Sequence, residues 1–242
     1  MARAAGRSRL GAVVSQVGSG PAGGLIDILE RVCVDAAATL DACGVGVSVM
    51  TAGGVHGLAA ASDPATARIE ELQFTFGEGP CIDAFAASRP VLMSELDGAA
   101  SARWPMYTPA VADAGVRAVF AFPLQIGAAR LGVLDVFRDR PGPLTRTELG
   151  RAFAFAEQAV TVLLDGQERA SAEPSGSDGL DDAFDHGAVV FQAQGMVMVQ
   201  LGVPVAEALV RLRAYAYSEG RALSEVAADI VARRIHLDRD ET

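Results

Sequence analysis

Lysine is absent from this 242-residue chain, so every basic side chain is an arginine. The formal net charge is −10 at pH 7, and an acidic chain is not an obvious nucleic-acid binder unless its arginines gather on one surface. A single arginine is therefore weak evidence for nucleic-acid binding, because lysine, the usual alternative, is never used. The acids are unevenly placed: between residues 165 and 186, seven acidic residues accompany one arginine.

Cysteine and long apolar runs are also scarce. Cys33, Cys43 and Cys81 show no CxxC spacing, so they indicate neither a disulfide framework nor a zinc site. No apolar run reaches the roughly 18 residues of a membrane span. The arginines near the N-terminus are not followed by the apolar stretch of a signal peptide. We therefore expect a cytoplasmic protein.

No set of catalytic residues stands out. The chain has no Ser/His/Asp arrangement, Walker loop, paired carboxylates or metal-ligand motif at a recognisable spacing. His56 is a lone histidine in a turn, and nothing near it supports a haem ligand. We therefore expect no enzyme activity, no metal site and no cofactor.

The larger part of the chain, residues 24–169, reads as one mixed domain behind a disordered arm at 1–23. Apolar spacing predicts helices at its two ends, and runs of alternating or continuous apolar residues predict strands between them. The strands at 119–126 and 131–137 are apolar on both faces, so both faces must be covered. The expected order is helix 25–40, strands 45–50 and 57–61, helix 65–74, loop 77–81, strand 91–93, a helical or irregular stretch 103–114, strands 119–126 and 131–137, and helix 149–164.

Four residues of this domain are candidates for a ligand pocket. Cys81 follows Gly79-Pro80 in a loop, where a helix N-terminus would lower the thiol pKa and favour redox sensing; equally, Cys81 is a small buried hydrophobe. Asp135 is a lone charge in an apolar strand and either anchors a ligand or bonds to backbone at a sheet edge. Trp104 either covers the pocket mouth or pins its loop to the sheet. Phe122 lies on a strand that would line the cavity.

This order of elements, with Phe76-Gly77-Glu78-Gly79-Pro80-Cys81, Arg89-Pro90-Val91 and Leu131-Gly132-Val133-Leu134, resembles a GAF domain. The resemblance implies an α+β fold with a central antiparallel sheet, helices on one face and a small-molecule pocket on the other. It also implies a sensor, whose signal the sequence does not name.

The C-terminal part reads as three amphipathic helices. Residues with helical spacing form one buried face in each, Gly202 ends the first helix, and Pro204 precedes the second. An acidic linker at 170–185 joins them to the first domain, so this all-α unit spans 186–242. The expected buried residues are Val189, Val190, Ala193, Met196, Val197, Leu201, Val205, Leu209, Leu212, Leu223, Val226, Ala227, Ile230, Val231 and Ile235.

The segment Val190-Phe191-Gln192-Ala193-Gln194-Gly195-Met196-Val197-Met198, with Leu201-Gly202, Glu207-Ala208-Leu209 and Leu212-Arg213, resembles the ANTAR domain. That family is a three-helix RNA-binding module of bacterial transcription antitermination regulators. The resemblance implies binding to stem-loops of nascent transcripts, and a homodimer that engages paired stem-loops. Two positions depart from the family: Gln194 and Gly187 stand where basic residues are usual.

The RNA-contact candidates combine arginines, which bind phosphates, with tyrosines, which stack on unpaired bases. The alternative is an ordinary solvated surface in which Arg211 pairs with Glu207 and Arg233 with Asp229. The long helix before residue 165 could form the dimer contact through Phe153, Ala156, Val160 and Leu163. The RNA-contact candidates are Gln194, Gly195, Arg213, Tyr215, Tyr217, Arg221, Arg233 and Arg234.

The sequence thus favours a signal-responsive antitermination regulator with a GAF sensor and an ANTAR RNA-binding domain. Two alternatives stay open. One is a GAF-fold redox enzyme that resembles the free methionine sulfoxide reductases and uses Cys81, with Cys33 or Cys43 as the resolving cysteine. The other is a protein-interaction module that binds no RNA, which a weak dependence of binding on salt would reveal.

Overall fold

The computed structural model describes residues 24–50, 56–172 and 180–238. The expected disordered arm at 1–23 and the side chain of His56 lie outside the described residues, and Gly187 is described only as part of a helix. The elements are α1 (Leu25–Leu40), β1 (Gly44–Met50), β2 (His56–Ala61), α2 (Pro64–Phe76), α3 (Pro80–Ala87), β3 (Val91–Met93), α4 (Gly98–Arg103), α5 (Tyr107–Asp113), β4 (Ala118–Ile126), β5 (Ala129–Arg138), α6 (Arg146–Ala172), α7 (Leu180–Leu201), α8 (Val205–Ser218) and α9 (Leu223–Val231).

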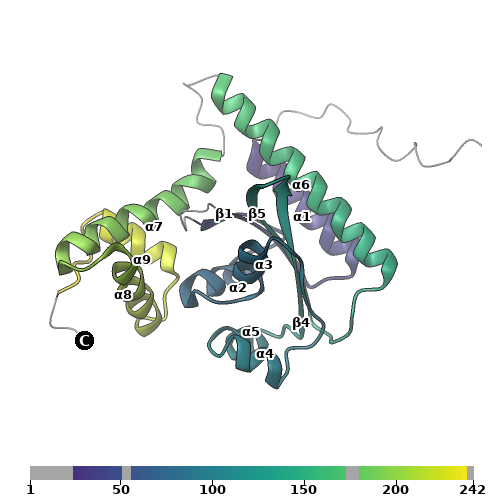
Figure 1. Cartoon of the computed structure of the whole chain (residues 1–242), viewed down its shortest axis with the longest axis horizontal. Helices are drawn as coiled ribbons and strands as arrows, with labels where there is room; N and C mark the ends of the chain where they lie inside the picture. Colours follow the sequence, from purple (N-terminus) through teal and green to yellow (C-terminus); the bar gives the residue numbers. More distant parts are fainter. Residues whose placement is uncertain (1–23, 51–55, 173–179, 239–242) are drawn as a thin grey trace, which may run out of the picture.

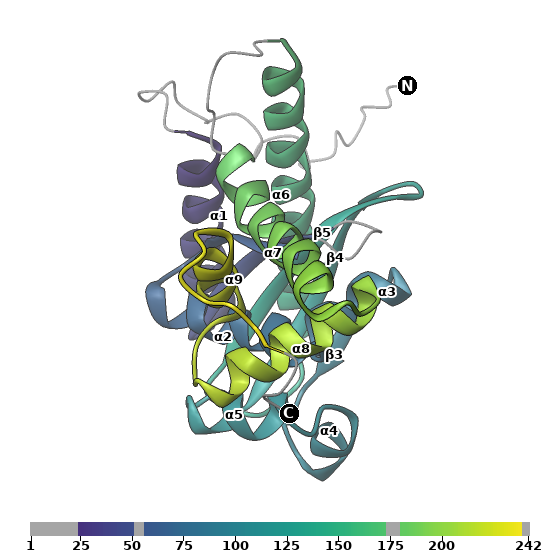
Figure 2. The same ribbon diagram turned by 90° about the vertical axis from the view of Figure 1, so that its left-hand side faces the viewer.

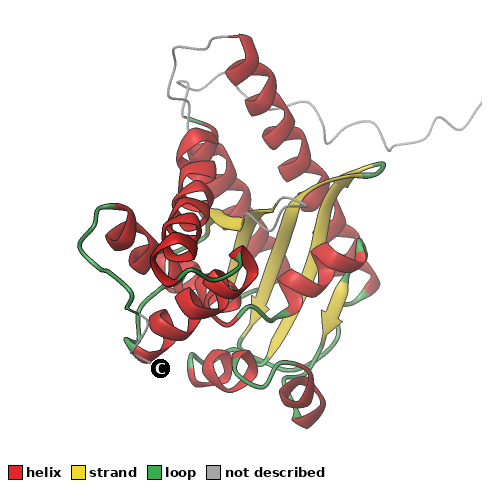
Figure 3. Ribbon diagram, turned by 60° about the vertical axis from the view of Figure 1, so that its left-hand side comes forward, coloured by secondary structure: helices red, strands yellow, loops and turns green. Residues whose placement is uncertain are grey.

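A five-stranded sheet with the order β2-β1-β5-β4-β3 forms the centre of the first domain, and its paired strands are antiparallel. Figures 1 and 3 show helices α1 and α6 on one face and α2 to α5 on the other. Strands β4 and β5 are buried on both faces over most of their length, as their continuous apolar runs predict. The sheet therefore separates two cores with different contents.

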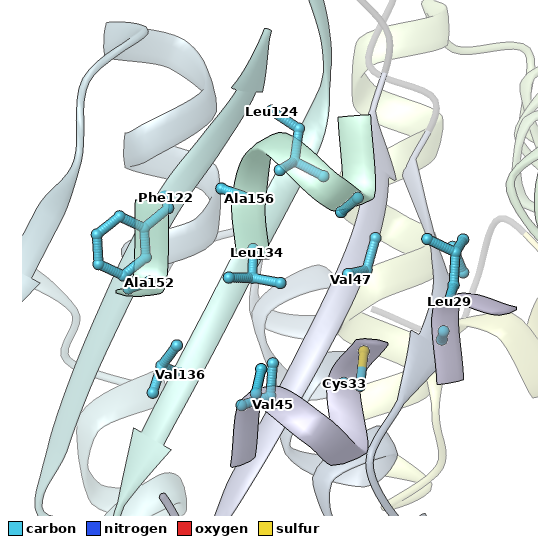
Figure 4. Close-up of a cluster of buried hydrophobic side chains, with 14 of the residues drawn as sticks. Leu29, Cys33, Val45, Val47, Phe122, Leu124, Leu134, Val136, Ala152 and Ala156 are labelled. Carbon is cyan, nitrogen blue, oxygen red and sulfur yellow. The ribbon is translucent and has the colours of Figure 1, made fainter. Parts of the chain in front are cut away.

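The core under α1 and α6 is built mainly from apolar residues. Alternate residues of β1, β4 and β5 point into it, among them Val47, Phe122 and Leu134 (Figure 4). Small residues of α6, including Ala152 and Ala156, let this helix lie close to the sheet. The expected dimer stripe is thus largely used within the chain: Ala156 and Leu163 are buried in this core, and Phe153 packs edge-on against Phe122.

A reciprocal cap fixes the start of α6 and joins it to the sheet. The Glu148 carboxylate accepts from the Thr145 backbone N–H at 2.7 Å, and the Thr145 hydroxyl accepts from the Glu148 N–H at 3.2 Å. The same carboxylate forms an ion pair with Arg138 of β5. Arg138 is itself buried and donates to the Leu40 carbonyl at 2.6 Å.

The three C-terminal helices form a separate bundle with its own core. The expected buried faces are confirmed for Ala193, Val197, Leu212, Val226 and Ile230, which are all fully buried. The α7 helix is followed by Gly202, which has a left-handed φ of 66° that favours glycine. The third helix is shorter than expected, because α9 ends at Val231 and Ile235 packs from the following segment.

The bundle lies against the first domain (Figure 2). Helix α7 packs beside the edge strand β2, and α8 and α9 contact α2. A helix over a sheet edge also shields unpaired backbone groups from other strands. The arrangement brings the end of α2 to the surface of the bundle.

Three boundaries differ from those expected. The expected loop at 77–81 runs into the short helix α3, and the stretch at 103–114, expected to be helical or irregular, contains α5 and follows directly on α4. Helix α6 continues to Ala172 and α7 begins at Leu180, so the expected linker at 170–185 is helical at both of its ends.

Among the described residues, no single helix is long and apolar enough to cross a membrane. Only the segments 189–201 and 205–218 taken together, which are bent by 103°, pass that test.

Candidate functional site

The Phe76-to-Cys81 segment positions the side chains of the second core. Gly77 ends α2 with a φ of 73°, and Gly79 adopts a φ of 143° that a larger residue would resist. Pro80 then opens α3, which places Cys81 in the first turn of a helix. Glu78 accepts from the backbone N–H groups of Met106 at 2.6 Å and Tyr107 at 3.0 Å and so caps α5.

A buried polar cluster lies between this segment and the sheet. Glu70 of α2, Cys81 of α3 and Asp135 of β5 are all fully buried, and their potential ligand atoms lie within 4.8 Å of one another. The neighbours of Asp135 across the sheet are Gly46 and Ala121, whose small size leaves room for the Glu70 carboxyl. A Cβ atom at Gly46 would overlap Glu70 Oε1.

Only part of the cluster is satisfied by hydrogen bonds. Glu70 Oε2 accepts from Ser48 Oγ at 3.4 Å and from Gln73 Nε2 at 3.1 Å. Gln73 Oε1 in turn accepts from the Cys81 backbone N–H at 2.8 Å. Glu70 Oε1, both carboxyl oxygens of Asp135 and the Tyr107 hydroxyl have no hydrogen-bond partner within the described part of the chain. An unsatisfied buried polar group costs about 1–3 kcal/mol, and more when it is charged.

Burial changes the acid–base properties of these groups. It raises the pKa of Asp135 to about 7, although the polar side chains of Cys81, Glu70 and Gln73 beside it counteract part of this rise. Burial, followed by the charge of Asp135, raises the pKa of Glu70 well above its usual value. Two carboxylates can only accept, so they remain unpartnered unless a proton is shared between them. The two buried carboxyl groups are therefore stabilised by binding a positive charge, either a proton or a cation.

The structure brings two of the four expected pocket residues together, Cys81 and Asp135. Phe122 lies on the opposite face of the sheet in the apolar core, so it does not line the same site. Trp104 is buried and donates its Nε1–H to Asp83 at 3.1 Å, which pins its segment to α3. Of the two readings of Cys81, redox sensing requires a lowered thiol pKa, but burial, and then the charges of Asp135 and Glu70, raise the pKa of Cys81. The fully buried side chain agrees with the other reading, a small buried hydrophobe.

The other two cysteines are not part of this cluster. Cys33 is fully buried in the apolar core on the far face of the sheet, and Cys43 is exposed at the start of β1. Neither stands among the groups that surround Cys81. A redox cycle with a resolving cysteine therefore has no support from this arrangement.

On the bundle, three of the expected RNA contacts are already engaged. Gln194 is buried and its Nε2 donates to the Val205 carbonyl at 2.6 Å, which joins α7 to the start of α8. Arg213 Nε donates to the Phe74 carbonyl at the end of α2, at 3.1 Å. Tyr217 is exposed on one side but packs edge-on against Phe76, with ring centroids 5.9 Å apart.

The remaining arginines differ in their pairing. Arg221 and Arg234 both bind Asp229, at 2.7 Å and 2.5 Å. Of the two pairs in the solvated-surface alternative, Arg211–Glu207 forms at 3.2 Å, whereas Arg233–Asp229 does not. Arg233 is exposed, and no ion pair or hydrogen bond joins its side chain to another described residue.

Gly195 and Tyr215 complete the set. No atom lies within 4 Å of the place that a Cβ of Gly195 would occupy, so this position faces open space. Tyr215 is half-buried and packs on the bundle core. The surface therefore offers the unpaired Arg233 side chain and open space at Gly195, whereas Arg213 and Tyr217 are held by α2.

Family models match both parts of the chain. The model described as GAF domain matches residues 24–163, which is more than half of the chain. The chain belongs to the GAF domain family. The model described as ANTAR domain matches residues 178–231, so the C-terminal bundle is an ANTAR domain. The expected α+β GAF fold followed by an all-α bundle is confirmed. Both families are regulatory and not catalytic.

Solved structures show the same GAF fold. A domain from a two-component sensor histidine kinase protein of Sinorhizobium meliloti 1021 has a TM-score of 0.50 at 16% identity, over 62% of this chain and 99% of that one. The GAF domain of the cyanobacteriochrome TePixJ has a TM-score of 0.50 at 16% identity, over 63% and 98% of the two chains. At these identities the likeness shows the fold alone. No curated protein matches the chain.

Sequence reasoning missed half of the polar cluster. Glu70 and Gln73 fall in a helix whose polar residues would ordinarily face solvent. The signal that could have found them is the lone Asp135 in an apolar strand, because a buried acid requires a polar partner from the element packed on it.

Proposed function

We propose that this protein is a signal-responsive transcription antitermination regulator. The ANTAR bundle binds structured RNA, stem-loops of nascent transcripts, and the GAF domain is the sensor of a small signal. Such a protein acts where transcripts are made, in the cytoplasm. The observation that carries the proposal is the direct contact between the two domains, in which α2 of the sensor holds residues of the RNA-contact set.

This contact suggests how a signal reaches the RNA-binding surface. The Arg213 guanidinium lies on the Phe74 carbonyl and beside Gly77, where a Cβ would come within 2.5 Å of Arg213 Nη1. Desolvation in this position lowers the pKa of Arg213, which also marks it as withdrawn from solvent. Arg213 is half-buried in this position, so RNA phosphates would reach its whole guanidinium once α8 leaves α2. The docked arrangement is thus the low-affinity state of the regulator.

A second contact has the same consequence. The Leu223 backbone N–H at the start of α9 donates to Thr75 Oγ1 at 3.2 Å, and Thr75 is buried. Together with the Phe76–Tyr217 ring contact, this fixes both α8 and α9 on the last turn of α2. A signal that moves that turn would release both helices at once.

A homodimer is part of this proposal, since paired stem-loops need two bundles. The face of α6 around Ala156 and Leu163 is buried in its own domain, so the dimer contact must use other surfaces. Sedimentation equilibrium of the full chain, with and without RNA, measures the state directly. A chain that remains monomeric when saturated with paired stem-loop RNA would contradict the dimer.

The decisive test is RNA binding by the full chain. RNA crosslinked to the protein in the cells that make it is sequenced, and a recovered hairpin serves as the probe. Arg233→Ala should weaken binding several-fold and reduce the slope of log affinity against log salt by about 1, since one phosphate contact is lost. Arg211→Ala is the matched control, because Arg211 already pairs with Glu207.

Binding that depends only weakly on salt and is equal in both variants would refute this RNA surface. The same measurement separates the interaction-module alternative, in which a polypeptide is the partner. A protein that crosslinks to no RNA above background would refute the proposed function as a whole.

A further inference from the structure

We propose that Glu70, Cys81 and Asp135 form a binding site for one divalent transition-metal ion, of the zinc or ferrous type. The proposal rests on the arrangement of the GAF core, and it holds whether or not the bundle binds RNA. The three side chains come from α2, α3 and β5, which pack together at the centre of the domain (Figure 1). No other group of this kind lies among the described residues.

The ligand atoms already approach the spacing that a metal requires. Cys81 Sγ and one oxygen each of Glu70 and Asp135 lie within 4.8 Å of one another. In a tetrahedral site with metal–ligand bonds of about 2.0–2.3 Å, ligand atoms are about 3.5 Å apart. Side-chain movements of about an ångström would close the cluster on an ion.

The cluster holds several oxygen atoms that have no hydrogen-bond partner within the described chain. Glu70 Oε1 and both oxygens of Asp135 are buried and unpartnered. The Tyr107 hydroxyl is a second, independent feature, because it is fully buried without a partner in the described chain. Burial, and then the nearby Asp135, Glu70 and Cys81, raise its pKa. The tyrosine is thus positioned to bond to a ligand or to an ion-bound water molecule.

Neighbouring side chains hold two of the three proposed ligands in place by hydrogen bonds. Ser48 and Gln73 donate to Glu70 Oε2 and leave Oε1 free to bind an ion. Gln73 also holds the backbone of Cys81. Metal ligands in proteins are usually fixed by such outer hydrogen bonds. The glycine at position 46 provides the space in which the Glu70 carboxyl lies.

The ligand types select the class of ion. A thiolate is a soft ligand that favours zinc, iron and related metals over magnesium and calcium. The two carboxylates add negative charge, and a divalent ion compensates it in a buried place where the charges would otherwise be unfavourable. The ligands number three, so a fourth position is available to Tyr107, to water or to a small molecule. A fourth position of this kind is typical of reactive sites.

The ion would also act on the element that holds the bundle. Glu70 lies one helical turn before Phe74, whose carbonyl accepts from Arg213. An ion that draws Glu70 towards Cys81 and Asp135 would shift α2 at the turn that contacts α8 and α9. The metal site therefore offers a candidate signal for the sensor.

The first experiment measures metal content. The full chain is produced in medium with added zinc or iron and is also refolded from denaturant with Zn²⁺ or Co²⁺, because the buried site is closed in the folded chain. Elemental analysis should give about one ion per chain. The Co²⁺ protein should show a near-ultraviolet thiolate-to-metal charge-transfer band.

Variants locate the ion. Cys81→Ser should abolish the charge-transfer band and weaken metal binding at least about tenfold, and Asp135→Asn should weaken it similarly. Cys33→Ser is the matched control, because Cys33 is equally buried but lies on the other face of the sheet; it should retain both the band and the ion. Circular dichroism establishes that each variant is folded.

Several results would overturn the proposal. The wild-type protein could stay free of metal after both treatments, which would leave a proton as the occupant of the cluster. Alternatively, the Cys81→Ser and Asp135→Asn proteins could bind Co²⁺ as the wild type does, which would show an adventitious ion only. If Cys81→Ser does not fold, the absence of a charge-transfer band in Cys33→Ser and wild type decides against the site. None of these readouts uses RNA, so they are independent of the proposed function.

Discussion

At the residue scale, only some members of the buried polar cluster could be predicted from the sequence. Asp135 stands out as a charge in an apolar strand, and Cys81 stands out in a glycine-rich loop. Glu70 is hidden, because a glutamate in an amphipathic helix ordinarily faces solvent. Its partner Asp135 is distant in sequence, so no spacing rule connects them; only the packing of α2 on the sheet brings the two carboxyls together.

Gly46 is the residue whose size permits this cluster. Gly46→Ala would force the Glu70 carboxyl to move, and overpacking of this kind costs about 1–3 kcal/mol. Urea unfolding should therefore show a lower midpoint. Gly150→Ala is the control, since no atom lies within 4 Å of the added methyl group and alanine favours the helix. Equal midpoints for Gly46→Ala and wild type would show that Glu70 is not confined by the strand.

Glu148 gives the molecule a defined sensitivity to acid. Hydrogen bonds from Thr145, together with the Arg138 ion pair, lower the pKa of Glu148 to about 2. An acid whose pKa is lower in the folded than in the unfolded chain stabilises the fold above its unfolded pKa, and this stability is lost as pH falls through the folded pKa. We expect about 1–2 kcal/mol to be lost between about pH 4.5 and 2, after allowance for partial exposure.

Glu148→Gln should remove this part of the acid dependence and lower stability at neutral pH, because Arg138 would then be buried with the Leu40 carbonyl as its remaining described partner. Urea unfolding at a series of pH values measures both effects. Glu157→Gln, on the same helix, is the control. Parallel pH profiles for Glu148→Gln and wild type would contradict the assignment.

At the element scale, the strands and long helices could be predicted because each carries one strong apolar period. Val133, Asp135 and Phe137 face one side of the sheet and Leu134 and Val136 the other, as strict alternation requires. Phe122 pairs with Leu134 and therefore lies on the other face of the sheet from Asp135. That register could not be read from the sequence, which does not state how β4 and β5 align. Helices α3 to α5 are too short to show a helical period.

Helix α2 is the element that connects the two domains, and its last turn offers a test of release. Thr75→Val removes the acceptor of the Leu223 N–H, and Phe76→Ala removes the ring that contacts Tyr217. Both changes should loosen the bundle and raise affinity for the recovered hairpin RNA. Each lost contact is worth about 1 kcal/mol, so about a fivefold gain is expected from each.

Thr161→Val is the matched control, since Thr161 is exposed on α6, away from the bundle contact. Fluorescence anisotropy with the labelled hairpin measures the affinities. RNA binding that is unchanged or weaker in Thr75→Val and Phe76→Ala would show that the docked arrangement does not restrain the ANTAR domain.

At the scale of the whole molecule, both domains are foreseeable from their motifs, but their arrangement is not. The contact depends on a main-chain carbonyl at Phe74, a hydroxyl at Thr75 and the edge of one ring at Phe76. None of these has a sequence pattern of its own. The docking surface is also shared with the RNA-contact set, so a reading of Arg213 and Tyr217 as RNA ligands alone describes only the released state.

If docking and RNA binding exclude each other, a covalent link across the contact should hold the regulator in its low-affinity state. Phe76→Cys and Tyr217→Cys, combined with Cys43→Ser to remove the exposed thiol, allow a short cleavable bismaleimide to join α2 to α8. The linked protein should bind the hairpin at least about fivefold more weakly than the same protein after cleavage of the linker, a difference of about 1 kcal/mol. The singly substituted Phe76→Cys protein, treated identically, controls for the reagent. Equal affinity before and after cleavage would show that RNA binds the docked form, and that the sensor acts on the ANTAR domain by a route other than release.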